Sequence, residues 1–250
     1  MNPELEAPAD AGTSPPPGKS WVERAQALFE VLLLAGLVSS MAASIPFVWA
    51  EGTRASLLAN ARVVSGYLLL EAAVILGLLF LILWIHRESL RDFGLPWGQW
   101  RREVLVGLLV VPLLFGLNAL VGVLFRIYFP KAFLEINPLT ELIRTPRDLV
   151  LFMATALVAG GIKEELQRAF ILRRFQAYLG GAHVGLIVWS AAFGLGHYVQ
   201  GAQGIIAAGL YGFIFGILYL SRGSLIAPMV AHGAYDVLAL LGYWFFARHS

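Results

Sequence analysis

The chain has 250 residues, of which 58% are hydrophobic and 14% are charged, and its mean hydropathy is +0.73. Soluble domains carry about 25% charged residues, so this composition excludes an ordinary soluble domain and predicts a polytopic membrane protein. The sequence contains no cysteine, which excludes disulfides, iron–sulfur clusters, thiolate zinc sites and a cysteine nucleophile. Its net charge is +2, and it has no basic runs interleaved with aromatic residues, so a nucleic-acid-binding function is not expected.

The first residues of the chain are rich in proline and poor in large apolar side chains. Such a segment buries too little apolar surface to fold, so we expect a disordered tail over residues 1–22. The tail lacks the basic and then apolar order of a signal peptide, and we expect no cleavage.

Seven apolar stretches follow the tail, and the longer ones reach the ~20 residues that a helix needs to cross a bilayer. They cover residues 27–50, 63–85, 104–129, 149–162, 183–197, 205–220 and 225–246. Residues 23–148 are expected to form N-terminal membrane helices, and residues 149–248 a membrane core that carries the site. The predicted fold class is all-α, a polytopic transmembrane helical bundle of about seven spans, with six and eight as alternatives.

Two polar connections separate the stretches of the first half. Residues 86–102 contain Trp97 and Trp100, which favours an interfacial segment with tryptophans at headgroup level. Residues 130–148 form a longer surface connection. Loop Lys and Arg residues number ten on the side of the N-terminus and six on the other, which predicts a cytoplasmic N-terminus. The Ala-, Leu- and Gly-rich composition favours a bacterial source, and therefore the inner (plasma) membrane. The ten basic residues on the side of the N-terminus are Lys19, Arg24, Arg87, Arg91, Arg101, Arg102, Arg168, Arg173, Arg174 and Arg222.

Four charged or amide side chains lie within the apolar stretches of the first half. Glu30 is near the start of its stretch, so we expect it to reach the interface. Glu71, Asn118 and Arg126 are expected to pair with one another between helices, in a structural role.

Two adjacent carboxylates, Glu164 and Glu165, end the fourth apolar stretch, beside Lys163 and Arg168. An ionisable group inside a membrane helix costs roughly 2.5–3.5 kcal/mol on insertion scales, so it indicates a functional site by default. The four-residue spacing from Glu164 to Arg168 places both on one helix face. An interfacial ion pair at a helix end is the alternative interpretation.

Two histidines and an aspartate follow on later stretches, as Phe193-Gly-Leu-Gly-His197 and His232-Gly-Ala-Tyr-Asp236. His232 and Asp236 are four residues apart, so they share a helix face. A single buried histidine is more often a hydrogen-bonded core residue than a catalyst, and a His–Asp pair four residues apart can simply neutralise itself. Polar groups on three separate stretches together favour a shared site.

With these three motifs the sequence resembles the CPBP (CAAX protease and bacteriocin-processing) family of intramembrane glutamic proteases, which is similar to the type II CAAX prenyl endopeptidases. The family pattern is a Glu-Glu pair followed by an Arg, then Phe-x-x-x-His, then His-x-x-x-Asn or Asp. The resemblance covers about residues 150–240, and the Arg-Asp-Phe-Gly-Leu stretch at 91–95 also looks like a family segment.

The resemblance implies an intramembrane endopeptidase without a metal or another cofactor. Glu164 would be the general base that takes a proton from water, and His197 would position that water. His232 and Asp236 would stabilise the oxyanion, with Asp236 either protonated or orienting His232. Glu165 and Arg168 would hold the helix geometry.

One spacing departs from the family pattern, because two residues rather than three separate the Glu pair from Arg168. Alignment on Arg168 would place Lys163 where the first Glu belongs. Alignment on the carboxylates keeps Glu164 and Glu165 in place, and helical spacing lets Arg168 reach both. We prefer the second alignment.

The expected partners are the lipid bilayer and a membrane-associated peptide or protein substrate, such as a C-terminal tail or a precursor peptide, with no nucleic acid. Nothing in the sequence identifies a prenyl pocket. Two alternatives stay open: a zinc-dependent membrane metalloprotease with Glu164, His197 and His232 as ligands, and a non-catalytic transporter-like or immunity protein.

Simple alternation of spans would direct Glu164 and His197 to opposite sides of the membrane. A shared site therefore predicts one long helix from about Leu149 to Tyr178, and a fifth helix that runs past His197.

Overall fold

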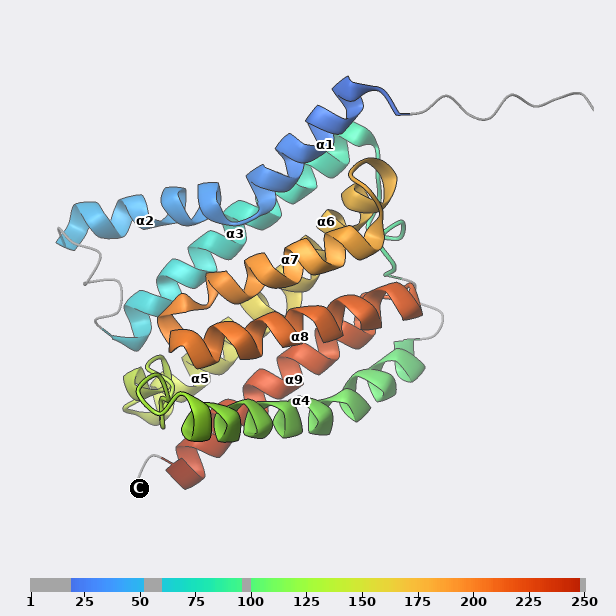
Figure 1. The fold of residues 1–250 in the computed structure, drawn as a ribbon. Helices are drawn as coiled ribbons and strands as arrows, with labels where there is room; N and C mark the ends of the chain where they lie inside the picture. The colour runs from blue at the N-terminus through green and yellow to red at the C-terminus, as the bar shows by residue number, and fades with distance from the viewer. Residues whose placement is uncertain (1–18, 52–59, 96–99, 248–250) are drawn as a thin grey trace, which may run out of the picture.

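The computed structural model describes residues 19–51, 60–95 and 100–247. Within these residues every regular element is helical, and the helices form one bundle (Figure 1). The predicted all-α fold is confirmed. The elements are α1 (Trp21–Leu34), α2 (Leu37–Glu51), α3 (Ala61–His86), α4 (Trp100–Tyr128), η2 (Thr140–Leu142), α5 (Pro146–Thr155), η3 (Ala156–Glu164), α6 (Glu165–Tyr178), α7 (Ala182–Gly196), η4 (Tyr198–Gln200), α8 (Gly201–Arg222), α9 (Ile226–Gly242) and η5 (Tyr243–Ala247).

Five helical segments of the described chain are long and apolar enough to cross a membrane: residues 21–46, α3, α4, 198–222 and 226–246. A sixth helix, α7, is apolar but shorter. Large apolar side chains such as Phe80, Trp84 and Leu109 are exposed along α3 and α4, as expected of surfaces that face lipid. The chain is a multi-pass membrane protein, and the number of crossings differs with how the shorter helices are counted.

The first apolar stretch does not form the single helix that we expected over residues 27–50. Gly36 adopts a φ of 100°, which is easily reached only by glycine, and it separates α1 from α2. The Leu34 carbonyl beside this break accepts a hydrogen bond from the Gln167 amide. Ser20 caps α1, so residues 21 and 22 belong to a helix rather than to the expected tail, whose residues 1–18 lie outside the described part.

Pro146 to Tyr178 form one continuous helix, because the residues at both junctions of α5, η3 and α6 keep helical dihedral angles. Thr145 begins this helix with a capping box that involves Asp148. The middle segment, η3, is π-helical and ends at Glu164. The predicted long helix is therefore present, with Glu164 near its middle.

The predicted extension of the fifth helix past His197 is wrong. The α7 helix ends at Gly196, His197 follows as its C-cap, and a short turn leads into α8 at Gly201. Gly201 has a φ of 74°, so the chain reverses here and α7 and α8 pack as an antiparallel pair (Figure 1).

The stretch 91–95 packs the connection between α3 and α4 against the core. Phe93 is buried and stacks on Phe170 of α6, with ring centroids 6.1 Å apart. The Gly94 carbonyl accepts a hydrogen bond of 2.7 Å from the Leu225 amide. Trp97 of the predicted interfacial segment lies outside the described residues, and Trp100 is the half-exposed first residue of α4.

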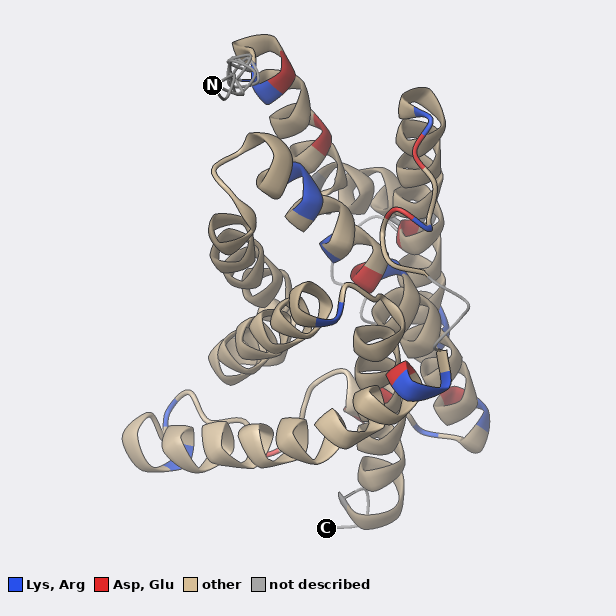
Figure 2. Cartoon of the chain, turned by 90° about the vertical axis from the view of Figure 1, so that its right-hand side faces the viewer, with Lys and Arg blue, Asp and Glu red and all other residues tan. Residues whose placement is uncertain are grey.

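Charged residues gather at the end of the bundle where α3 and α8 end and α4 begins, which faces the viewer in Figure 2. Arg222 pairs there with Glu103, and Arg174 pairs with Glu30 and Glu88. Two expectations need correction. Glu30 is buried in this ion-pair cluster rather than extended to the interface, and Arg168, counted among the loop charges, lies inside the bundle.

Candidate active site

Glu165, the first residue of α6, is buried between the side chains of Arg168 and His232. Its carboxylate forms an ion pair with Arg168, and each of these two side chains is 1% exposed. The same carboxylate lies 2.7 Å from Nδ1 of His232 on α9. An ion-paired carboxylate accepts hydrogen bonds, so Nδ1–H donates to Glu165. This bond leaves Nε2 as the ring atom of His232 that faces the rest of the site.

The Arg168 guanidinium lies between two aromatic rings, 4.9 Å from the centroid of Phe193 and 5.3 Å from that of Phe215. Such stacking is favourable for a planar cation away from water. We expected Arg168 to reach both carboxylates, and the structure pairs it with Glu165 alone. Phe215, which the sequence did not single out, also stacks on His232, at 4.8 Å between centroids.

Glu164 is the last residue of η3, and its two carboxylate oxygens have different neighbours. Oε1 accepts a hydrogen bond of 3.2 Å from Lys163 Nζ. Oε2 lies 3.8 Å from His232 Nε2. One oxygen is thus held by a cation while the other faces His232.

Asp236 lies one turn after His232 on α9, and its Oδ2 is 3.5 Å from His232 Nε2. The predicted shared face of these two residues is present. Because Glu165 already orients the ring through Nδ1, Asp236 is not needed for that purpose. Its carboxyl group instead lies on the Nε2 side, together with Glu164.

His197, at the end of α7, contacts the same region from another helix. Its Nδ1 lies 2.8 Å from the Phe193 carbonyl, and since a carbonyl only accepts, Nδ1–H donates and Nε2 of the neutral ring is left as an acceptor. Its ring packs on Phe193 at 4.6 Å. No hydrogen bond joins His197 to the other predicted site residues in the part of the chain that the structure describes.

Gly160 of η3 borders the candidate site, although its place there does not follow from the sequence alone. A Cβ atom on it would lie 2.8 Å from Asp236 Oδ2 and 3.2 Å from His232 Nε2. The missing side chain therefore lets Asp236 Oδ2 and His232 Nε2 lie close to the η3 backbone. Gly161, one residue on, packs on Gly233 of α9 and lets the two helices approach closely.

The two possible alignments of the Glu pair have different geometric consequences. Lys163 contacts Glu71 and Glu164 rather than His232, whereas Glu164 and Glu165 both lie against His232. The arrangement thus agrees with the alignment on the carboxylates. The π-helical segment η3 ends at Glu164, so the boundary between η3 and α6 lies within the pair.

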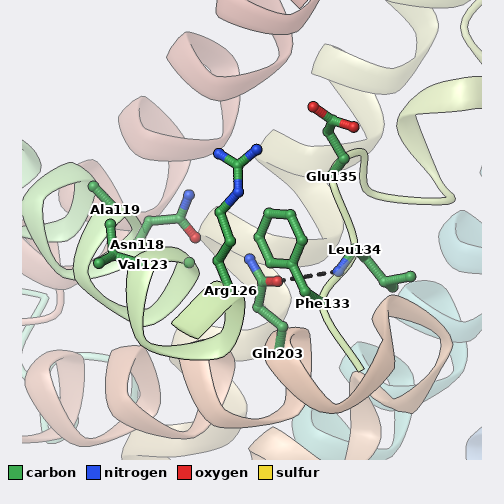
Figure 3. Close-up of a pocket in the computed structure, with 9 residues that line it drawn as sticks. Asn118, Ala119, Val123, Arg126, Phe133, Leu134, Glu135 and Gln203 are labelled. Carbon is green, nitrogen blue, oxygen red and sulfur yellow. Dashed lines mark hydrogen bonds between the residues drawn. The ribbon is translucent and has the colours of Figure 1, made fainter. Parts of the chain in front are cut away.

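The predicted group of Glu71, Asn118 and Arg126 does not form. Glu71 pairs with Lys163 at 3.5 Å and accepts a hydrogen bond from Ser40. Asn118 and Arg126 instead line an open cavity of about 280 Å³ between α4, the following loop and the start of α8 (Figure 3). The Arg126 guanidinium lies there over the ring of Phe133, at 5.6 Å.

Within the described ranges, no group of three or more His, Asp or Glu side chains is arranged to hold a metal ion. The described ranges include the three ligands of the zinc alternative, which are Glu164, His197 and His232. Each of the two histidines keeps one ring nitrogen without a hydrogen bond to protein, as described above.

Comparison with known families adds independent information on this segment. Residues 146–238 match the family model described as type II CAAX prenyl endopeptidase Rce1-like. This segment is similar to the type II CAAX prenyl endopeptidases. The resemblance inferred from the motifs is thereby confirmed. No curated protein and no solved structure matched the chain.

The matched segment contains all six predicted site residues: Glu164, Glu165, Arg168, His197, His232 and Asp236. It begins at the first residue of α5 and ends within α9. The match supports a CAAX-type intramembrane protease in general terms. Ser40 and Glu71, which contact the site through Lys163, lie outside the segment.

Proposed function

We propose that this protein is an intramembrane endopeptidase that cleaves a membrane-associated peptide or protein with a water molecule activated by Glu164. The observation that supports this proposal is the approach of Glu164 Oε2 and Asp236 Oδ2 to His232 Nε2, beside Gly160. These groups come from two helices and would be costly in a membrane interior without a function.

In this mechanism Glu164 and His197 act on the water. The carboxylate Oε2 takes one proton as the water oxygen forms a bond with the carbonyl carbon of the substrate. The free Nε2 of His197 accepts a hydrogen bond from the other water hydrogen and so fixes the direction of attack. A carboxylate held by Lys163 at one oxygen presents its other oxygen in a defined position.

The resulting oxyanion needs hydrogen-bond donors. His232 can supply one through a protonated Nε2, because Glu165 holds its Nδ1–H and stabilises the imidazolium. Asp236 can supply another only in its protonated form, since an ionised carboxylate would repel the oxyanion. Collapse of the intermediate breaks the C–N bond, and Glu164 returns its proton to the leaving amine.

The substrate class follows from the setting of the site. A peptide must reach carboxylates that lie within a helical bundle whose outer surface is apolar, so the substrate is a segment anchored in or near the membrane, such as a C-terminal tail or a precursor peptide. The charged end of the bundle in Figure 2 supports a cytoplasmic location of that end. With it we propose a cytoplasmic N-terminus and a bacterial inner membrane.

The test is cleavage by the purified full chain in proteoliposomes. The probes are an internally quenched peptide with one membrane anchor, a farnesylated CAAX peptide and the same peptide without the farnesyl group, with products identified by mass spectrometry. We expect cleavage of at least one probe, and a loss of roughly 100-fold or more in Glu164→Gln and His197→Ala. Full activity of both variants in folded protein would refute the proposal.

The same assay separates the alternatives that the sequence left open. Activity that persists in a strong chelator agrees with a carboxylate base, whereas loss on chelation and recovery with added zinc would favour a metalloprotease. A biological function that survives Glu164→Gln would favour a non-catalytic protein.

A further inference from the structure

Lys163 is a buried cation to which the mechanism above gives no chemical step of its own. Its side chain is 5% exposed, and its Nζ lies 3.2 Å from Glu164 Oε1 and 3.5 Å from Glu71 Oε2. An ammonium group inside a membrane protein is costly unless it is paired. Here one cation lies between two carboxylates from different helices.

The contacts continue from Lys163 into the N-terminal half of the chain. Glu71 of α3 uses one oxygen for Lys163 and accepts a hydrogen bond of 2.5 Å from the Ser40 hydroxyl at the other. Both Ser40 and Glu71 lie outside residues 146–238, which match the family model. The series Ser40, Glu71, Lys163, Glu164 thus connects α2 and α3 to the carboxylate that faces His232.

Lys163 also determines which oxygen of Glu164 is available. With Oε1 bound to the ammonium group, Oε2 is the oxygen on the His232 side, at 3.8 Å from Nε2. A carboxylate without this contact is free to rotate about its terminal torsion, which is broad and has no strong preference. The position of Oε2 therefore depends on the position of Nζ, which in turn depends on Glu71.

We propose that Lys163, held by Glu71, is a positioning residue that orients the Glu164 carboxylate and balances its charge, so that α2 and α3 form part of the active site. This inference rests on the proposed function, because it assigns Lys163 a role toward the base of that reaction. Lys163 touches neither water nor substrate in this role, so its loss changes kcat and leaves KM nearly unchanged.

The experiment compares kcat and KM of Lys163→Met, Lys163→Arg and Glu71→Gln with those of the intact full chain in proteoliposomes, with whichever quenched peptide the intact chain cleaves. Misplacing a catalytic group by about 1 Å costs up to 100-fold. We expect a loss of roughly 10- to 100-fold in kcat for Lys163→Met, and a smaller loss for Lys163→Arg and for Glu71→Gln, which keep a cation beside Glu164.

The double variant Lys163→Met/Glu71→Gln separates positioning from plain charge balance. Lys163→Met alone leaves two buried carboxylates without their cation, and removal of the Glu71 charge relieves one of them. We expect the double variant to regain thermal stability relative to Lys163→Met but not kcat. Recovery of kcat together with stability would overturn the proposal.

Arg222→Met is the matched control, because it removes a different ion pair, with Glu103, at the charged end of the bundle. Its kcat is expected to equal that of the intact chain. A wild-type kcat in folded Lys163→Met would also overturn the positioning role. The proposed function is tested separately by Glu164→Gln in the same assay. If Glu164→Gln is inactive while Lys163→Met is fully active, only the positioning role is refuted. Full activity of Glu164→Gln would refute the proposed function itself.

Discussion

Gly160→Ala adds a single methyl group at the point where η3 faces His232 and Asp236. The new carbon would lie 2.8 Å from Asp236 Oδ2 and 3.2 Å from His232 Nε2. Carbon and oxygen atoms pack comfortably at about 3.3–3.5 Å, so Asp236 must move by roughly half an ångström or more. Its carboxyl group is at the end of a side chain and can shift at little cost. Since displacements of about 1 Å cost up to 100-fold in rate, we expect kcat to fall by about 10- to 100-fold.

Stability is expected to respond differently from activity in this variant. Ala is better than Gly in a helix by up to ~1 kcal/mol, which offsets the small shift of Asp236, so the unfolding temperature in detergent should stay near that of the intact chain. Gly116→Ala on α4 is the control, because nothing lies within 4 Å of the added carbon. The reasoning is refuted if folded Gly160→Ala cleaves the peptide probe as fast as Gly116→Ala does.

Three further predictions concern single charged residues. Arg168→Met leaves the Glu165 carboxylate buried without its cation, which should lower the free energy of unfolding by about 3–5 kcal/mol; denaturation in detergent measures this, and a change below ~1 kcal/mol would contradict it. Asp236→Asn should keep or raise kcat at neutral pH, because an amide donates to the oxyanion without first gaining a proton; a tenfold loss would count against a donor role. In the connection after α3, the Ser89 backbone amide and hydroxyl donate to Asp92 and hold the pKa of that carboxyl below its usual range. The resulting stabilisation is present above the unfolded pKa near 3.9 and is lost as pH falls through the folded pKa. Asp92→Asn should therefore lower the unfolding temperature at pH 7 but not at about pH 2. An equal decrease at both pH values would contradict a stabilisation that comes from the ionised Asp92 carboxylate.

Much of the site could be predicted from local patterns in the sequence. The four-residue spacing of His232 and Asp236 places them on one face of any helix, and the structure has them 3.5 Å apart. The adjacent carboxylates at 164 and 165 were conspicuous because charge is rare in apolar stretches. The long helix around them followed from the need to bring His197 close. The first two inferences use only short-range geometry and composition, whereas the long helix also depends on the hypothesis of a shared site.

The missed features depend on contacts between distant parts of the chain. Lys163 and Glu71 are 92 positions apart, and nothing in one sequence tells which buried carboxylate a lysine will meet; we had assigned Glu71 to Asn118 and Arg126. The break at Gly36 is a similar case, because a glycine within an apolar run is compatible with a continuous helix. The sequence did hold one unused signal, a lysine beside two glutamates in a membrane stretch.

The π-helical segment from Ala156 to Glu164 has a consequence for how such a site can change in evolution. A wide turn accommodates one more residue than an α-turn while the helix on either side keeps its place. A gain or loss of one residue here can be taken up by the wide turns, so the side chains that follow keep their direction instead of turning by about 100° as they would in a regular α-helix. A helix with this property tolerates changes in length within its span while the carboxylates keep their direction. Comparisons of related chains should therefore allow gaps inside this membrane helix.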